Sequence, residues 1–311
     1  MNNQTVSIHK YIVREDIIKA VRTFFYKQQF HEVITPLLNK ALPLEPNLRP
    51  FSTTHEYNGV RETFFLPHSP ERGIKKMLAL GLGNCFAIGK SFRNYERVGS
   101  LHLHEFIMLE WYRKDAVYTD IMNDMERLMV EINETIKNES IHFEKPFPRI
   151  SLNTLFKERV GESLDDLIKD EELFRTVATK KGYKTEMASW EELYDQLFVN
   201  EVEPAFSSEP FFLIDFPARV SPLCKKQKEN SHFAERFELY IHKIEIANGN
   251  TENTDVAAIR LFFEKEQAKT GMPIDEEFLS TLEAMQNNLY AGVGMGIDRL
   301  TMIYTGEEIF V

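Results

Sequence analysis

The chain has 311 residues, of which 43% are hydrophobic and 27% charged, with 24 Phe against 14 Gly and 13 Pro. This composition excludes a disordered, fibrous or low-complexity chain, and the length suffices for a large hydrophobic core. The 37 Lys and Arg residues against 48 Asp and Glu give a net charge of −11, which disfavours nonspecific binding along a nucleic-acid backbone.

The expected compartment follows from the cysteines and the hydropathy. Cys85 and Cys224 lie far apart and match no disulfide framework or metal-binding spacing. No cationic segment followed by an apolar run opens the chain, and no apolar run approaches the ~18 residues of a spanning helix. We therefore predict a cytoplasmic protein that does not bind membranes.

The spacing of apolar residues predicts the elements in chain order. A helix over 12–25 precedes a strand over 30–34 that ends before Pro36. A strand over 61–66, a helix over 70–80, strands over 86–88 and 106–112 and a helix over 118–137 follow. Residues 151–203 are predicted to be a mainly helical, charge-rich insertion. Then come strands over 211–216, 237–241 and 244–247, helices over 255–270 and 275–285, a Gly-rich strand over 292–296 and a last helix.

This order of elements predicts the fold class. Strands joined by hairpins and loops, with helices gathered around them, are typical of an α+β fold built on an antiparallel sheet. The sequence has no internal repeat, no linker-like segment and no clear boundary. We therefore expect residues 1–311 to form one domain.

Residues 106–112 are the first candidate for a site. Strand alternation places Phe106, Met108, Glu110 and Tyr112 on one face, and the opposite face is apolar. An aromatic ring, a carboxylate and a phenol in one line suit a flat ring bound at one end and a cation at the other. A half-exposed strand with no ligand is an equally good interpretation of this segment alone.

Other candidates surround this strand in the sequence. Arg93 can present a planar fork to a phosphate, and alternating glycines at 292, 294 and 296 leave a strand face open to a ligand, with Asp298-Arg299 after it. Glu245 and Glu252 flank Asn248-Gly249 and could hold a divalent cation with substrate phosphates. His102 and His104 are spaced as zinc ligands on a strand, but no third ligand is indicated.

Taken together, three segments resemble, in order, the signature motifs of class II aminoacyl-tRNA synthetases. They are the helix–strand unit ending at Pro36, Phe92-Arg93-Asn94 leading to 105–110, and 292–299. Within that class the chain is similar to lysyl-tRNA synthetase, through the phrases at 69–71, 221–223, 235–239 and 245–249. The resemblance implies the class II catalytic fold, an antiparallel sheet flanked by helices.

The expected plan lacks the anticodon-binding domain of a lysyl-tRNA synthetase, and so resembles the elongation factor P lysyltransferases. That resemblance implies ATP-dependent activation of a lysine, typically (R)-β-lysine, as an aminoacyl-adenylate, and transfer to a lysine side chain of elongation factor P. It also implies Mg²⁺ as cofactor and a homodimer, because the motif at Pro36 lies at the family's dimer interface. A tRNA substrate is disfavoured.

The resemblance also implies roles for individual residues. Arg93 matches the arginine that holds the α-phosphate, Phe106 the ring stacked on adenine and Arg299 the guanidinium over its other face. The arginines Arg93 and Arg299 are thus the expected catalytic residues. Further ATP contacts are expected from Asn94, Glu96, His102, Glu245, Ile246 and Gly296. Glu245 and Glu252 match the magnesium carboxylates. The amino-acid pocket is expected to contain Ser69, Pro70, Glu71, Glu110, Tyr112, Asn248 and Glu252.

Departures from the family pattern leave alternatives open. The loop after Asn94 differs from the family, Asn250 and Asn253 make the expected pocket more polar, and Gly294 stands where elongation factor P enzymes commonly have alanine. The choice between α- and β-lysine therefore stays open. One alternative is a lysine-type ligase acting on another carrier, a tRNA or a protein. Another is a catalytically weak regulatory paralogue.

Overall fold

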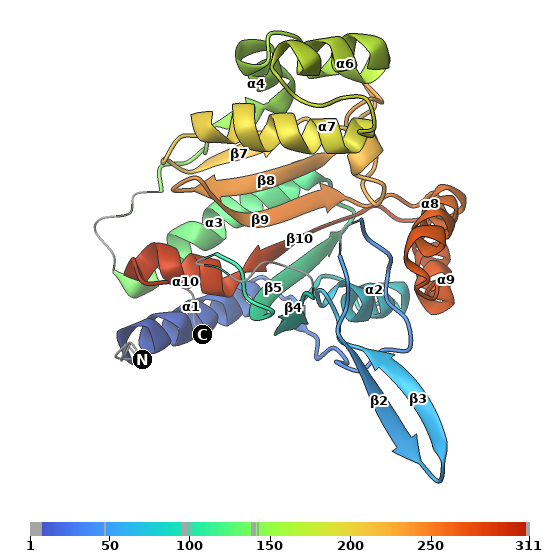
Figure 1. The fold of residues 1–311 in the computed structure, drawn as a ribbon. Coiled ribbons are helices and arrows are strands. Elements are labelled where there is room, and N and C mark those ends of the chain that lie inside the picture. Colours follow the sequence, from blue (N-terminus) through green and yellow to red (C-terminus); the bar gives the residue numbers. More distant parts are fainter. Residues whose placement is uncertain are drawn as a thin grey trace, which may run out of the picture. The chain divides into compact units, whose positions relative to one another are not determined.

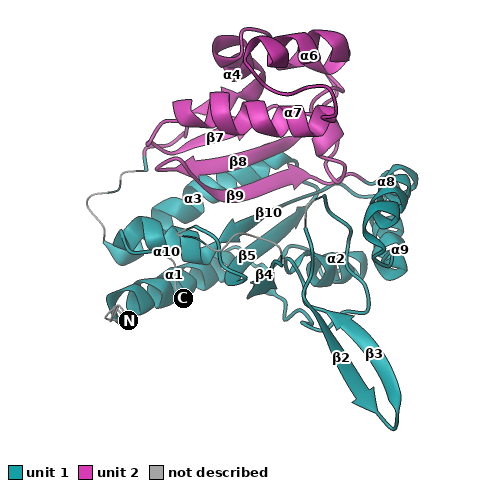
Figure 2. Ribbon diagram, in the orientation of Figure 1, with its two compact units in different colours: residues 1–143, 254–311 teal, residues 144–253 magenta. Residues whose placement is uncertain are grey.

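The computed structural model describes residues 8–46, 48–94, 99, 101–137, 141 and 143–308, and all structural statements concern these residues (Figure 1). The chain divides into two compact units (Figure 2). The first comprises Met1–Phe143 and Thr254–Val311, and the second Glu144–Asn253. Each unit is described by itself.

The helices of the first unit follow the predicted ranges closely. They are α1 (Ile8–Lys27), α2 (Glu71–Ala79), α3 (Tyr118–Ile136), α8 (Val256–Thr270), α9 (Glu276–Met285) and α10 (Ile297–Thr305). Asp255 and Asp275 are N-caps, because their carboxylates accept hydrogen bonds from the backbone N–H groups of Ala258 and Phe278. Such caps satisfy N–H groups that have no partner inside the helix, and they explain where α8 and α9 begin.

The sheet of the first unit has the strand order β1-β4-β5-β10. These strands are β1 (His31–Glu32), β4 (Cys85–Phe92), β5 (Glu105–Lys114) and β10 (Tyr290–Gly296). The pairs β4–β5 and β5–β10 are antiparallel, and β1 pairs parallel with β4. Phe25 of α1 packs on Phe86 of β4 and Trp111 of β5, with ring centroids 4.8 and 5.1 Å away, so α1 covers the apolar face of this sheet.

A separate hairpin pairs β2 (Ser52–Tyr57) with β3 (Val60–Phe65) through Asn58-Gly59, both with positive φ (Figure 1). The sequence analysis predicted the second strand and missed the first. All six residues of β2 are exposed. A strand without a buried face has no apolar alternation, and that alternation is the signal on which the prediction relied.

The second unit contains helices and four strands of the eight-stranded sheet that the described residues form. Its helices are α4 (Leu152–Arg159), α5 (Leu164–Lys169), α6 (Glu171–Lys180) and α7 (Trp190–Leu197), followed by short helical turns over Phe198–Val202 and Glu203–Ala205; another turn covers Ala218–Val220. Its strands are β6 (Arg149–Ser151), β7 (Phe211–Ile214), β8 (Arg236–Ile241) and β9 (Ile244–Thr251), in the order β9-β8-β7-β6. The β6–β7 pair is parallel and the others are antiparallel.

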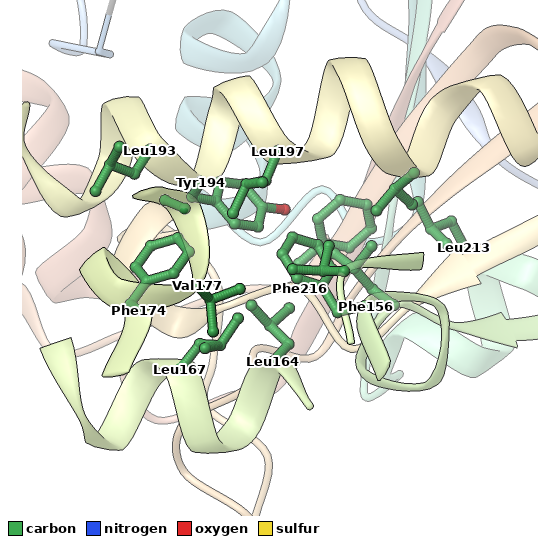
Figure 3. Close-up of a cluster of buried hydrophobic side chains, with 14 of the residues drawn as sticks. Phe156, Leu164, Leu167, Phe174, Val177, Leu193, Tyr194, Leu197, Leu213 and Phe216 are labelled. Atoms are coloured by element: carbon green, nitrogen blue, oxygen red, sulfur yellow. The ribbon is translucent and has the colours of Figure 1, made fainter. Parts of the chain in front are cut away.

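The helices α4 to α7 enclose a hydrophobic core within the second unit (Figure 3). Trp190 and Tyr194 stack with ring centroids 5.5 Å apart. Phe156 also stacks on Tyr194, with ring centroids 5.8 Å apart. Leu213 and Phe216, from β7 and its end, belong to the same cluster. The segment 151–203 therefore packs on strands of its own unit.

The predicted α+β class, with a mainly antiparallel sheet flanked by helices, is confirmed, and the only departures among the described strand pairs are the parallel edges at β1 and β6. Within the described residues, every helix is too short or too polar to cross a membrane.

Candidate active site

The first cluster of predicted site residues begins at the N-terminus of α2. Pro70 is the N-cap and Glu71 the first helical residue, where the helix dipole favours a carboxylate. The backbone N–H of Glu71 donates to Ser69 Oγ at 3.1 Å. Ser69, Pro70 and Glu71 thus form one turn, whose geometry is set by the start of the helix.

Strand β5 provides the next side chains of this cluster. The register pairs Tyr112 with Gly292 and Glu110 with Gly294 of β10. A Cβ atom on Gly292 would lie 2.3 Å from the Tyr112 ring, so only glycine lets this ring lie over the strand. Glu110 and Tyr112 are each 4% exposed. The interpretation of this face as a half-exposed strand is therefore wrong.

Glu110 is a buried acid in a polar surrounding. Its Oε1 accepts a hydrogen bond from the Tyr112 hydroxyl at 2.8 Å, and its Oε2 has no hydrogen-bond partner among the described residues. Burial, and then the nearby carboxylate of Glu71, raise the pKa of Glu110 to about 8. An ammonium group that binds beside this buried carboxyl group would strongly stabilise its ionised form.

Sequence analysis missed Lys75, one turn after Glu71. Its side chain is 1% exposed, and its ammonium pairs with the Glu71 carboxylate. The Nζ atom lies 5.6 Å from the ring centroid of Tyr112 and 5.4 Å from that of Phe278. The signal in the sequence was a lysine on the apolar face of the predicted helix. Ile74, Lys75 and Leu78 form the buried face of α2, and lysine is rare at buried positions.

Arg93 and Phe106 lie together near the ends of β4 and β5. The Arg93 guanidinium carbon lies 5.3 Å from the Phe106 ring centroid. The backbone N–H of Arg93 donates a hydrogen bond to the backbone carbonyl of His104 at 3.0 Å. Asn94 follows, and its N–H donates to the Arg49 carbonyl at 2.9 Å. An aromatic face beside a planar cation suits a purine ring next to a phosphate.

Helix α10 directly follows β10 and brings Arg299 to the same sheet. The Asp298 carboxylate accepts the backbone N–H of Ile107 at 2.6 Å, which ties the start of α10 to β5. Arg299 Nη2 lies 3.0 Å from His102 Nε2, and Arg299 Nε donates to the Leu101 carbonyl at 3.3 Å. A Cβ atom on Gly296 would lie 3.7 Å from the Arg299 side chain. The structure thus brings together Arg299, His102 and Gly296. Glu96 lies outside the described residues.

The second cluster lies on β8 and β9 of the second unit. Three positions separate Glu245 from Asn248, so an unbroken strand would place their side chains on opposite faces. The register pairs Glu238 with Asn248 and Tyr240 with Glu245, which leaves Ile246 as the extra, buried residue of a bulge. The bulge therefore brings Glu245 to the face of Glu238 and Asn248.

Sequence analysis also missed Glu238, a 6% exposed carboxylate on β8. It accepts hydrogen bonds from Arg236 at 2.5 Å and from the Tyr240 hydroxyl at 2.8 Å, and the Asn248 amide lies 3.4 Å away. Burial and then Glu245 raise the pKa of Glu238 to about 7, even though Arg236 opposes this. A charged residue inside an otherwise apolar strand was the signal in the sequence.

Glu252 follows directly after β9 and is 4% exposed. Its Oε1 lies 3.3 Å from the Asn250 amide nitrogen, and its backbone bridges to Cys224. Asn253 donates to the Pro222 carbonyl at 2.9 Å. These contacts connect the end of β9 with the segment 221–224, which the sequence analysis also singled out.

Comparisons with known proteins identify the family of the chain. The family model for class II tRNA synthetases (D, K and N) matches residues 3–309. Elongation factor P–(R)-β-lysine ligase of Proteus mirabilis is 34% identical, over 98% of this chain and 93% of the relative. A homolog of that ligase from Aquifex aeolicus is 35% identical, over 94% of each chain. Lysine–tRNA ligase of Mycoplasma pneumoniae is 32% identical, over 95% of this chain and 62% of the relative.

Proposed function

The chain belongs to the class II tRNA synthetases (D, K and N), and from this premise we propose that it activates a lysine with ATP and transfers it to a lysine side chain of elongation factor P. The observation that carries the proposal is the near full-length similarity to ligases of that name, in a chain with a buried Glu110–Tyr112 pair beside Glu71. (R)-β-lysine is the isomer named in those relatives.

The activation step needs positioning more than acid–base chemistry. The amino-acid carboxylate, already ionised at pH 7, attacks the α-phosphorus of ATP, which forms the aminoacyl-adenylate and releases pyrophosphate. Arg93 aligns the α-phosphate and neutralises its charge, while Phe106 and Arg299 cover the two faces of the adenine. Asn94, Glu96, His102, Ile246 and Gly296 complete the proposed nucleotide site. An acceptor amine then attacks the adenylate carbonyl and releases AMP.

The amino-acid pocket recognises ammonium groups. Burying an ammonium without a partner is very unfavourable, and the carboxylates Glu71 and Glu110 with the Tyr112 hydroxyl provide partners for it. Ser69, Pro70, Asn248 and Glu252 are the other proposed pocket residues. The incoming ammonium also restores the ionised state of Glu110.

We propose that Glu245 and Glu252 contribute to binding Mg²⁺ together with the ATP phosphates, as the family resemblance implies. Carboxylate oxygens are hard ligands, and Mg²⁺ in nucleotide sites is held by one or two carboxylates plus phosphates. Glu252 is the second carboxylate that the family resemblance assigns to the metal. When bound, the ion would neutralise charge on the ATP phosphates.

We further propose a homodimer that forms through the region of α1 and Pro36. In the single chain Ile34 is 97% exposed, Leu38 55% and Ile12 50%, and isolated proteins rarely expose several large apolar side chains together. Light scattering at micromolar concentration should give twice the chain mass for the natural protein and the chain mass for Ile34→Glu/Leu38→Glu. A monomeric natural protein would contradict the dimer.

The net charge of −11 favours a protein acceptor over tRNA, and a cytoplasmic location accords with that acceptor.

The experiment has two stages. Pyrophosphate–ATP exchange is measured with α-lysine, both β-lysine enantiomers and a panel of other amino acids, and modification of elongation factor P is then followed by intact-protein mass spectrometry. We expect exchange with one lysine isomer and a single added residue on the factor. Exchange without any mass gain would redirect the proposal to another carrier, and the similarity to the Mycoplasma lysine–tRNA ligase makes tRNA the first to test. The absence of both exchange and ATP binding would favour a regulatory paralogue.

A further inference from the structure

A buried lysine within a pocket proposed to bind lysine needs an explanation. Lys75 is as inaccessible as the core residues Ile74 and Leu78 beside it, yet it carries an ammonium group. Placing a charge inside a protein is strongly unfavourable unless it is paired. Its partner is Glu71, one helical turn earlier, and the rings of Tyr112 and Phe278 lie around it.

The charges of this pocket can be counted. The negative charge of Glu71 raises the pKa of Glu110, and the positive charge of Lys75 lowers it. The register partners of Glu110, Ala87 on β4 and Gly294 on β10, do not titrate, and Cys85, two residues before Ala87, stays neutral because burial raises its pKa to about 12. On β5 the neighbouring titratable side chain is Tyr112, which donates to Glu110. With Glu110 ionised, these two acids and the one cation carry one net negative charge, and with Glu110 protonated they carry none.

We propose that Lys75 is a positioning residue of the amino-acid pocket, whose buried ammonium neutralises Glu71 so that Glu110 is the carboxylate that pairs with an ammonium group of the substrate. The inference deepens the proposed function and rests on it. Without Lys75, two neighbouring buried carboxylates would share a proton, so Glu110 would stay protonated to a higher pH and would be less available to pair with an ammonium group. Lys75 thus acts through Glu71 and Glu110 and need not touch the substrate.

The test is the pH dependence of KM for the amino acid in pyrophosphate–ATP exchange. Glu110 in the substrate-free protein is protonated below a pKa of about 8, and the ammonium binds its ionised form, so KM falls as pH rises and levels off near pH 8. In Lys75→Met the removal of a neighbouring cation raises the pKa of Glu110 further. We expect KM at pH 7 to rise about tenfold and the levelling-off to move about one pH unit upward. Lys75→Arg keeps the cation, and its profile should level off where the natural enzyme's does.

A second pair of variants keeps the test valid if Lys75→Met does not fold. In Glu71→Gln the like charge beside Glu110 is gone, so the profile should level off at lower pH. The double variant Glu71→Gln/Lys75→Met leaves neither partner as a buried unpaired charge. Because it also lacks the cation near Glu110, its KM should level off at a higher pH than that of Glu71→Gln. Identical profiles for these two variants, or an unchanged profile in folded Lys75→Met, would overturn the proposal. A purely structural role would change melting temperature without moving the profile.

A readout without substrate separates this inference from the proposed function. Because the folded state holds a proton on Glu110 that the unfolded state has lost, stability declines as pH rises from about 4.5 and levels off near the folded-state pKa. The melting temperature of Lys75→Met, relative to the natural protein, should therefore keep falling above pH 8. If no amino acid supports exchange, the proposed function fails while this measurement still tests the link between Lys75 and Glu110. A difference in melting temperature that does not vary with pH would refute that link.

Discussion

At the scale of residues, each unit contains a pair of acidic side chains that interact electrostatically, and at least one member of each pair is buried. Glu110 with Glu71 in the first unit and Glu238 with Glu245 in the second are pairs of acids, and in each the buried member has a raised pKa. Buried like charges raise the free energy of the unliganded protein, and a bound cation relieves the repulsion. In the second pair Glu238 already accepts a hydrogen bond from Arg236, whereas the first pair is suited to a cationic ligand such as an ammonium group.

Glu110→Gln should change the pH dependence of stability. Between pH 4.5 and about 8 the natural Glu110 is protonated in the folded state and ionised in the unfolded state, so stability falls as pH rises through this window. Glutamine does not titrate and still accepts the Tyr112 hydrogen bond. We expect equal melting temperatures near pH 5 and a variant that is more stable by about 4 °C at pH 8.

Calorimetry without amino acid checks this expectation, with Glu105→Gln as the control on the same strand, since Glu105 is exposed. If the difference between Glu110→Gln and the natural protein is the same at every pH, Glu110 does not titrate in this range.

Arg93→Ala should leave the fold intact and remove most activation. Its guanidinium is proposed to hold the α-phosphate, and losing one such preorganised donor typically lowers the rate by ~10²–10³-fold. Pyrophosphate exchange measures the loss. The matched control is Arg61→Ala on the exposed hairpin, where the arginine pairs only peripherally with Glu56. Exchange by Arg93→Ala within threefold of the natural enzyme would contradict the assigned role.

At the scale of elements, two local irregularities in strands place the site residues. The glycines of β10 remove side chains where β5 needs room, and the bulge at Ile246 changes which face of β9 carries Glu245. Asp298, at the start of α10, ties that helix to the backbone of β5. The positions of Tyr112, Glu245 and Arg299 therefore depend on backbone features of neighbouring elements as much as on the residues themselves.

Gly292→Ala should displace Tyr112, because the new Cβ would lie 2.3 Å from the ring. We expect a loss of ~1–3 kcal/mol in the free energy of unfolding, as for other overpacked cores, together with a raised KM for the amino acid. The comparison variant is Gly294→Ala, whose Cβ meets the flexible Met108 sulfur at 3.2 Å and should cost less. Denaturant unfolding and exchange kinetics measure both. Equal effects of the two variants would argue against the steric role of Gly292.

At the scale of the whole molecule, each unit has its own core. Phe25, Phe86 and Trp111 pack in the first, and Trp190, Tyr194 and Phe156 in the second. Two cores of this kind let one unit open locally while the other stays folded.

Trp190→Ala should therefore loosen the second unit selectively. The ring is 1% exposed, stacks on Tyr194 and donates to the Leu167 carbonyl at 3.1 Å, so its removal should cost ~3–5 kcal/mol. Hydrogen exchange should become faster in residues 144–253 and change little in α1, β4 and β5. Met187→Ala, at a 96% exposed position, is the control. Equal acceleration in both units would mean that they unfold as one.

The elements that were predicted correctly are those with a strong periodic pattern of apolar residues. The helices α1, α3, α8 and α9 bury one face, so their apolar periodicity predicted them, with α1 extending beyond the predicted range of 12–25. The alternation in β5 predicted which side chains share a face, and the register with β10 bears this out. The exposed strand β2 and the extension of β9 to Thr251 carried no such pattern and were missed.

The amino-acid sequence by itself determined most of the elements, the α+β class and the family, because periodicity and motif order are local properties of the chain. Only the tertiary structure decided that Lys75 pairs with Glu71 beside Glu110, that Tyr112 needs Gly292, and that a bulge aligns Glu245 with Glu238. Burial and the proximity of charges arise when distant segments pack together. The electrostatic state of the site is therefore a property of the fold.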